Sequence, residues 1–262
     1  VNAVLATARR GTGGALDTWI QSDDFAKNFV SGTREPGPTL VQRTDGQALI
    51  YRGRVNVISG RRGSGKTWLA LLMCALVLQD GLRILYYDME DREDAWHGRF
   101  EDIGVDIDSY ALAGQAVWIK PEDLPVADIQ RLVDYTAQFD MVVFDVVNRL
   151  ITRLGGTPDN GNNEMLWLYD NLFDPLAGRD VAVLLLDHPN KAGQRREAKS
   201  VDDLSPGGGA MKMNNASGLV IGLNVVDQFT RDKMGGRVDL ICLKDRSGHF
   251  EEGTAIGHFT GT

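Results

Sequence analysis

The chain has 262 residues, of which 43% are hydrophobic and 24% charged, so it can bury a full core in one large or two small α/β domains. Its net charge of −8 and pI near 5.0 argue against a uniformly basic nucleic-acid binder, although a local basic surface is compatible with both values. The two cysteines, Cys74 and Cys242, indicate reduced, buried thiols rather than a disulfide or metal framework, and no apolar run is long enough to cross a bilayer. We therefore expect a cytoplasmic protein without a membrane partner.

The first part of the chain is predicted to be an N-terminal arm and linker, residues 1–36, because glycine and proline recur there. Residues 37–262 are predicted to form one α/β domain. At its start, Asp45-Gly46 is typical of a turn, and the hairpin around that turn is expected at the edge of the central sheet.

A phosphate-binding loop runs from Gly60 to Thr67 and fits the pattern G-x-x-x-x-G-K-[ST]. A short apolar strand precedes the loop and an apolar helix follows it, which is the context that the motif needs. The backbone N–H groups and the helix N-terminus would hold a polyphosphate, with Lys66 at the β and γ phosphates and the Thr67 hydroxyl on Mg²⁺. ATP with Mg²⁺, or with Mn²⁺ in its place, is the expected cofactor. The residues expected to contact it are Gly60, Arg61, Arg62, Gly63, Ser64, Gly65, Lys66, Thr67 and Trp68.

Apolar strands alternate with helices after Gly81, which predicts a mainly parallel sheet covered by helices on both faces. Strands are expected at 83–88, 116–119, 141–145 and 181–187, and helices at about 92–102, 126–138 and 163–177. Strands at 218–223, 238–243 and 250–259 are joined by short turns and are expected to be antiparallel. The fold class is therefore α/β, with antiparallel strands at the C-terminal end.

Functional side chains are expected where parallel strands end. Asp145 follows Met-Val-Val-Phe and is predicted to hold Mg²⁺ opposite Thr67. Glu90, in Tyr-Tyr-Asp-Met-Glu-Asp, is the predicted base that polarises water, with Asp88 or Asp91 as substitutes. His188, after the strand that ends at 187, is predicted to sense the γ phosphate.

Two basic features complete the candidate site. Long loops rich in glycine and basic residues are expected at 149–163 and 191–209 and would contact DNA phosphates without reading sequence. Their candidate DNA-binding residues are Arg149, Arg153, Lys191, Arg195, Arg196 and Lys199. At the end of a later strand, Lys244 and Arg246 share one face and would converge on an anion, as an arginine finger from a neighbouring subunit does, although an exposed hairpin tip explains their spacing equally well.

These motifs, in this order, resemble the RecA-like ATPase core, and more narrowly its RepA-like branch of hexameric helicases and phage or plasmid ATPases. The matching pieces lie between residues 37 and 250: Gly60 to Thr67, Tyr87 to Asp91, Val142 to Asp145, Leu186 to Lys191, Gly207 to Lys212 and Leu243 to Arg246. The resemblance implies an ATPase site between subunits of a hexameric ring or filament, with Glu90 as base, His188 as sensor and Lys244 with Arg246 acting in trans. It also implies loops that face DNA and a nearly bare motor core, in the bacterial host cytoplasm if phage- or plasmid-encoded.

Three functions stay open at this stage. The first is a Mg²⁺-dependent ATPase that acts on single-stranded or branched DNA as a helicase or recombination motor. The second is a metal-dependent DNA nuclease on the same fold, in which Asp88, Glu90, Asp91 and Asp145 would hold one or two ions. The third is a nucleotide-gated assembly protein without a DNA role. Fold alone does not decide between them.

Overall fold

The computed structural model describes residues 36–120, 129–153, 162–189, 204, 217–228 and 236–261. Residues 37–262 form one compact unit. The predicted arm lies outside the described residues, except for Pro36. Within the described ranges no helix is both long and apolar enough to span a membrane.

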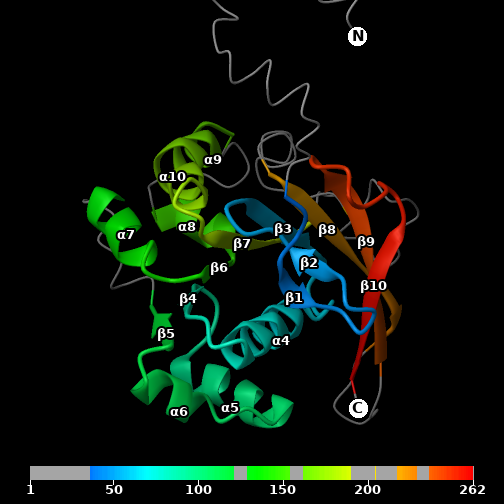
Figure 1. Cartoon of the computed structure of the whole chain (residues 1–262), viewed down its shortest axis with the longest axis horizontal. Coiled ribbons are helices and arrows are strands. Elements are labelled where there is room, and N and C mark those ends of the chain that lie inside the picture. The colour runs from blue at the N-terminus through cyan, green and yellow to red at the C-terminus, as the bar shows by residue number, and fades with distance from the viewer. Residues whose placement is uncertain are drawn as a thin grey trace, which may run out of the picture. The chain divides into compact units, whose positions relative to one another are not determined.

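An eight-stranded sheet forms the centre of this unit, in the order β10-β9-β8-β3-β7-β6-β4-β5 (Figure 1). The strands are β3 (Val55–Ser59), β4 (Ile84–Asp88), β5 (Ala116–Ile119), β6 (Met141–Asp145), β7 (Ala182–Asp187), β8 (Leu219–Asp227), β9 (Gly236–Asp245) and β10 (Ala255–Gly261). The strands from β8 to β5 pair in parallel, whereas β9 pairs antiparallel with both β8 and β10. The predicted fold class is confirmed.

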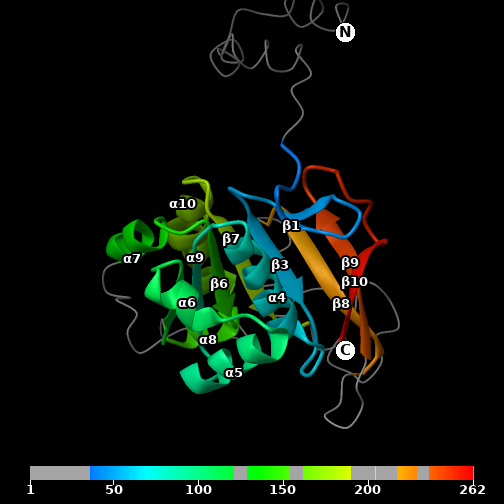
Figure 2. The ribbon, with the colours of Figure 1, turned by 60° about the horizontal axis from the view of Figure 1, so that its bottom comes forward.

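Helices cover both faces of the sheet (Figures 1 and 2). One face carries α4 (Lys66–Gln79), α5 (Glu93–Ile103) and α6 (Ile107–Leu112), and the other carries α7 (Ile129–Thr136), α8 (Val147–Arg153), α9 (Asn162–Leu168), the π-helical turn η2 (Tyr169–Phe173) and α10 (Asp174–Ala177). Strands β3, β4, β6 and β7 are buried along their whole length, which explains their unbroken apolar sequences. Because successive side chains point to opposite faces, each strand contributes to two core layers.

The prediction for the N-terminal hairpin is wrong in its placement. Strands β1 (Leu40–Gln42) and β2 (Ala48–Ile50) form a separate two-stranded sheet, not an edge of the central one. The strand that follows the hairpin, β3, already has β7 on one side and β8 on the other, so β2 has no place beside it. The hairpin instead buries Leu40, Leu49 and Ile50 in the core layer that contains α4.

A second correction concerns the segment after β6. It was predicted to be a loop from Arg149, but residues 147–153 form helix α8, which buries Leu150 and Ile151 in the core. The buried residues follow a helical period that the nearby glycines of the sequence obscure. Residues 154–161 lie outside the described part of the chain. Cys74 and Cys242 are buried free thiols, as predicted.

Candidate nucleotide site

The loop between β3 and α4 has the backbone that its glycines allow. Gly63 and Gly65 adopt left-handed conformations, with φ of 73° and 86°, which a residue with a side chain rarely adopts. At Gly60 space is the constraint, since a Cβ there would lie 2.3 Å from Ser64 Oγ. Gly65 is the N-cap of α4, so the first N–H groups of the helix, which lack intrahelical partners, face the loop. Such a turn at a helix N-terminus suits a phosphate group.

Lys66 lies inside this loop rather than in solvent, with only 7% of its surface exposed. Its Nζ donates to the carbonyl oxygens of Gly60 (2.5 Å) and Arg61 (3.2 Å) and lies 3.3 Å from Nδ1 of His188. Burial lowers the pKa of Lys66, whereas the carboxylates of Asp145 and Glu90 act in the opposite direction. Among the described residues the hydrogen-bond partners of Nζ are two carbonyl oxygens and a histidine ring, so no carboxylate bonds it directly and the cation can bind an anion such as a phosphate.

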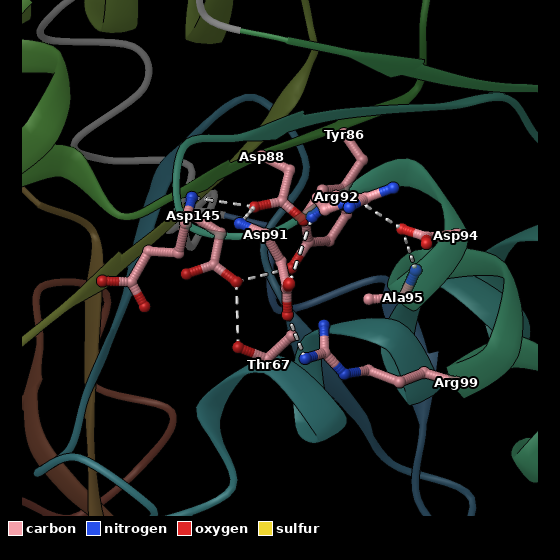
Figure 3. A network of polar contacts seen from close by, with 10 residues as sticks. Thr67, Tyr86, Asp88, Asp91, Arg92, Asp94, Ala95, Arg99 and Asp145 are labelled. Atoms are coloured by element: carbon pink, nitrogen blue, oxygen red, sulfur yellow. Dashed lines mark hydrogen bonds and ion pairs between the residues drawn. The ribbon is translucent and has the colours of Figure 1, made fainter.

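Asp145 connects the end of β6 to the loop. Its Oδ2 accepts hydrogen bonds from the Thr67 hydroxyl (2.9 Å) and the Tyr86 hydroxyl (2.8 Å) (Figure 3). Its Oδ1 is buried and has no hydrogen-bond partner among the described residues. Burial raises the pKa of Asp145 to about 6, and the neighbouring Asp88 adds to the shift. A buried carboxylate oxygen without a partner, next to a hydroxyl, is a donor set that fits Mg²⁺.

The turn after β4 places Glu90 near this carboxylate. Asp88 is the register partner of Asp145, and its Oδ1 accepts from the backbone N–H groups of Glu90 (3.0 Å) and Asp91 (2.8 Å). Asp91 in turn pairs with Arg99 of α5 (Figure 3). The other oxygen of Asp88 is buried without a partner in the described residues. Asp88 therefore fixes the turn, and Glu90 is the carboxylate that the turn presents outward.

Glu90 lies between two cationic or ionisable groups. One oxygen is 3.9 Å from Nε2 of His188 and 3.9 Å from Nε of Arg149. The nearby His188 ring has the largest effect on Glu90 and lowers its pKa; burial opposes this, and Arg149 and Lys66 reinforce it. Glu90 is thus held as a charged carboxylate, which is the state that a base requires. His188 connects it to Lys66, so three predicted residues meet at the carboxyl ends of β3, β4 and β7.

Lys244 and Arg246 lie at the opposite edge of the sheet. β9 runs antiparallel to β8, and Lys244 is paired with Val220, while Arg246 N donates to the carbonyl oxygen of Gly218 (2.8 Å). Gly218 lies level with Val55, the first residue of β3, whereas the phosphate loop begins after its last residue. The length of β3, roughly 16 Å at the usual rise per residue, separates Arg246 from the loop, whereas Lys244 is level with Val57 and roughly 10 Å from the loop along the strand direction. The pair therefore lies away from the phosphate loop of its own chain.

The remaining predicted residues lie partly around the site and partly beyond the described chain. Arg62 and Trp68 are exposed, and Arg61 is half-buried, at the rim of the loop. Arg149 is exposed on α8, and Arg153 ends the same helix. Lys191, Arg195, Arg196 and Lys199 lie outside the described residues.

Two residues of this arrangement were not anticipated from the sequence. Tyr86 bonds Asp145, and Arg99 pairs with Asp91. Strand alternation contained part of the signal, because Tyr86 shares a face of the sheet with α4, but only the paired register of β4 and β6 brings its hydroxyl to Asp145.

The loop after β3, the buried aspartate that ends β6 and the glutamate after β4 together define a P-loop ATPase with a RecA-like core. A family model described as an AAA domain matches residues 27–194, more than half of the chain, and the chain belongs to that family. Protein RecA of Lactobacillus johnsonii is 28% identical over 256 residues, which cover 88% of this chain and 67% of that protein. The resemblance inferred from sequence is confirmed for the ATPase core, while the roles of individual residues stay predictions.

Proposed function

We propose that this protein is a Mg²⁺-dependent ATPase that acts on DNA and hydrolyses ATP between adjacent subunits. The observation that carries the proposal is the convergence of Lys66, Thr67, Asp145, Glu90 and His188 at the carboxyl ends of neighbouring strands. Residues suited to phosphate binding, Mg²⁺ binding, proton abstraction and γ-phosphate sensing lie there together, and the expected trans-acting pair lies elsewhere in the chain.

Each of these residues has a separate role in phosphoryl transfer. Lys66 and the loop N–H groups bind and orient the phosphates, and Glu90 accepts the proton of the attacking water. Thr67 and Asp145 would hold Mg²⁺, which neutralises charge on the phosphates when it is bound. His188 contacts both Lys66 and Glu90, so loss of the γ phosphate would change its surroundings and be felt in the segment beyond β7.

Hydrolysis between subunits is supported by the position of Lys244 and Arg246. Their backbone lies toward the amino edge of the sheet, roughly 10 Å (Lys244) and 16 Å (Arg246) along the strand direction from their own loop. This position favours a cation pair that acts on the phosphates of a neighbouring copy of the chain. The resemblance to RepA-like ATPases implies a hexameric ring or filament with the same arrangement.

Two of the carboxylates that a nuclease would use are partly engaged by the chain itself. Asp91 pairs with Arg99, and Oδ1 of Asp88 accepts two backbone N–H groups, while Oδ2 of Asp88 has no partner among the described residues. The open Oδ1 of Asp145 belongs to a carboxylate that is bonded to Thr67 of the phosphate loop, which favours the ATPase over the metal-dependent nuclease.

The first experiment measures ATP hydrolysis with Mg²⁺ or Mn²⁺, with and without single-stranded or branched DNA, while the same DNA is followed for cleavage. We expect DNA to stimulate ATP hydrolysis. Lys66→Ala should reduce hydrolysis at least about 100-fold, because the lysine stabilises the negative charge of the phosphoryl group that is transferred. Cleavage of DNA that survives Lys66→Ala but is lost in Asp145→Asn would instead establish the nuclease. Hydrolysis that DNA does not change would favour a nucleotide-gated assembly protein.

The DNA contact is tested at Arg149, with Arg179 as the matched control. Both arginines are exposed, but Arg149 follows the carboxyl end of β6, whereas Arg179 precedes β7 and pairs with Asp134. We expect Arg149→Ala to weaken DNA binding and to reduce the slope of log affinity against log salt by about one. Arg179→Ala should leave both unchanged. Equal effects of the two variants would contradict a DNA contact at α8.

A further inference from the structure

Two consecutive tyrosines of β4, Tyr86 and Tyr87, are fully buried and point to opposite faces of the sheet. Both hydroxyl groups are satisfied. Tyr86 donates to Oδ2 of Asp145 at 2.8 Å, whereas the Tyr87 hydroxyl lies 2.7 Å from Oγ1 of Thr136, in the other core layer. The two side chains therefore have the same size and similar burial, and each hydroxyl has one bonding partner, but only Tyr86 bonds a carboxylate of the candidate site.

The Tyr86 ring is fully buried, and this packing restrains the position of its hydroxyl. The ring packs against Trp96 of α5, with centroids 6.3 Å apart, within the core layer of α4. A tyrosine hydroxyl is protonated at neutral pH, and here it donates to Oδ2 of Asp145. A carboxylate on its own rotates easily about its last bond, and a fixed donor on one oxygen removes that freedom.

The other donor to Asp145, the Thr67 hydroxyl, is also expected to bind Mg²⁺. The Thr67 hydroxyl bonds the same oxygen of Asp145 at 2.9 Å, but Thr67 is itself the predicted ligand of Mg²⁺. Tyr86 has no such second role. If Thr67 turns to the cation, Tyr86 is the donor that continues to hold Asp145.

We propose that Tyr86 is a positioning residue for the metal: its hydroxyl fixes Oδ2 of Asp145 and thereby presents the buried, unpartnered Oδ1 to Mg²⁺. This inference rests on the Mg²⁺ dependence proposed above. It adds to the site a residue that acts through another one and does not touch the nucleotide.

The test compares Tyr86→Phe with Tyr87→Phe, each of which removes one buried, bonded hydroxyl. Binding of Mn²⁺ in the presence of ADP is measured by electron paramagnetic resonance, binding of ADP alone in EDTA, and stability by denaturant unfolding. We expect Tyr86→Phe to raise the Kd for Mn²⁺ about 10-fold or more, the usual effect of losing a group that orients a metal ligand. Its affinity for ADP in EDTA should be unchanged, and Tyr87→Phe should alter neither value. The same Kd for Mn²⁺ in both variants would overturn the inference.

A double variant tests whether the effect passes through Asp145. In an Asp145→Asn background, adding Tyr86→Phe should not weaken Mn²⁺ binding further, because the ligand that Tyr86 orients is gone. An undiminished effect of Tyr86→Phe in that background would contradict positioning through Asp145. A wild-type protein that binds ADP but no Mn²⁺ would overturn the metal dependence as well, whereas normal Mn²⁺ binding with equal Phe variants overturns only the role of Tyr86.

Discussion

Two buried aspartates, each the last residue of a strand, differ in how completely they are bonded. At the carboxyl edge of the sheet, Asp145 has one oxygen bonded to Thr67 and Tyr86 and one without a partner among the described residues. At the amino edge, both oxygens of Asp245 accept the Tyr51 hydroxyl, at 2.9 and 2.8 Å. Asp245 also accepts three backbone N–H groups of the turn after β9, from Ser247, His249 and Phe250.

The difference separates a structural carboxylate from one that is available to a ligand. A buried polar atom without a partner costs free energy, and for a carboxylate beside a phosphate loop a bound cation would offset that cost. Both oxygens of Asp245 are bonded, so this cost does not arise there, and its hydrogen bonds stabilise the turn that contains Arg246. At Asp145 the cost falls on Oδ1, next to the phosphate loop, and a bound cation would remove the cost.

Replacing each aspartate by asparagine tests this contrast most strongly. Asp245→Asn should lower the free energy of unfolding by about 3 kcal/mol. The asparagine NH₂ group replaces one acceptor oxygen and faces backbone N–H groups, which then lose their acceptor. Asp145→Asn keeps an acceptor for Thr67 and Tyr86 and removes a buried charge, so stability at neutral pH should be equal or higher. Its ATP hydrolysis should fall on the order of 100-fold or more.

Denaturant unfolding and steady-state hydrolysis of both variants, without and with Mg²⁺, measure these outcomes. The distinction between a structural Asp245 and a ligand-binding Asp145 would be contradicted if Asp145→Asn were the less stable variant. It would also be contradicted if Asp245→Asn unfolded at the same denaturant concentration as the wild type.

The sequence predicted the parallel sheet because its strands are unbroken apolar runs, and it predicted the site because polar residues end those runs. Asp145, Glu90 and His188 could be found in this way, since strand ends in a parallel sheet meet at one edge. The bonding contrast could not be found. The sequence shows Asp245 only as the residue between Lys244 and Arg246. Two of its five hydrogen-bond contacts come from Tyr51, which lies far away in the chain, and the other three come from the conformation of the turn after β9.

Pairing between strands was also beyond the sequence. The hairpin β1–β2 has the expected turn, but its exclusion from the central sheet follows from β3 having β7 and β8 as partners. The helix α8 begins directly after β6, where nearby glycines suggested a loop. Local composition predicts turns and strands better than it predicts which strand lies beside which.

The pH dependence of stability gives a second, smaller test of the Asp145 side of the contrast. Burial raises the pKa of Asp145 to about 6, from an ordinary value of 3.8, so the folded protein binds this proton more tightly than the unfolded chain does. Its contribution to stability is therefore greatest below about pH 4, decreases as the pH rises to about 6, and is constant above that. The full change is about 3 kcal/mol.

Unfolding of the wild type and Asp145→Asn in EDTA between pH 4 and 8 isolates this contribution, because other groups cancel in the difference. The stability of the wild type relative to Asp145→Asn should decline from pH 4 to 6 and then level off. A difference that is flat with pH, or that rises, would contradict the burial of an unsatisfied charge at this edge.

The smallest expected effect tests whether the two edges meet across a subunit interface. In a mixture of Lys66→Ala and Arg246→Ala proteins, an intact site forms where the loop of an Arg246→Ala subunit faces the arginine of a Lys66→Ala subunit. Random assembly of equal amounts produces this pairing at about one quarter of the interfaces, so the mixture should recover up to about that fraction of wild-type hydrolysis. A mixture of Lys66→Ala with Asp145→Asn is the matched control, because both changes damage a subunit's own nucleotide site and no pairing restores one. Recovery only in the first mixture would place Arg246 in the site of the neighbouring subunit. No recovery, in mixtures whose co-assembly is verified by size, would leave the amino edge with the structural role of Asp245 alone.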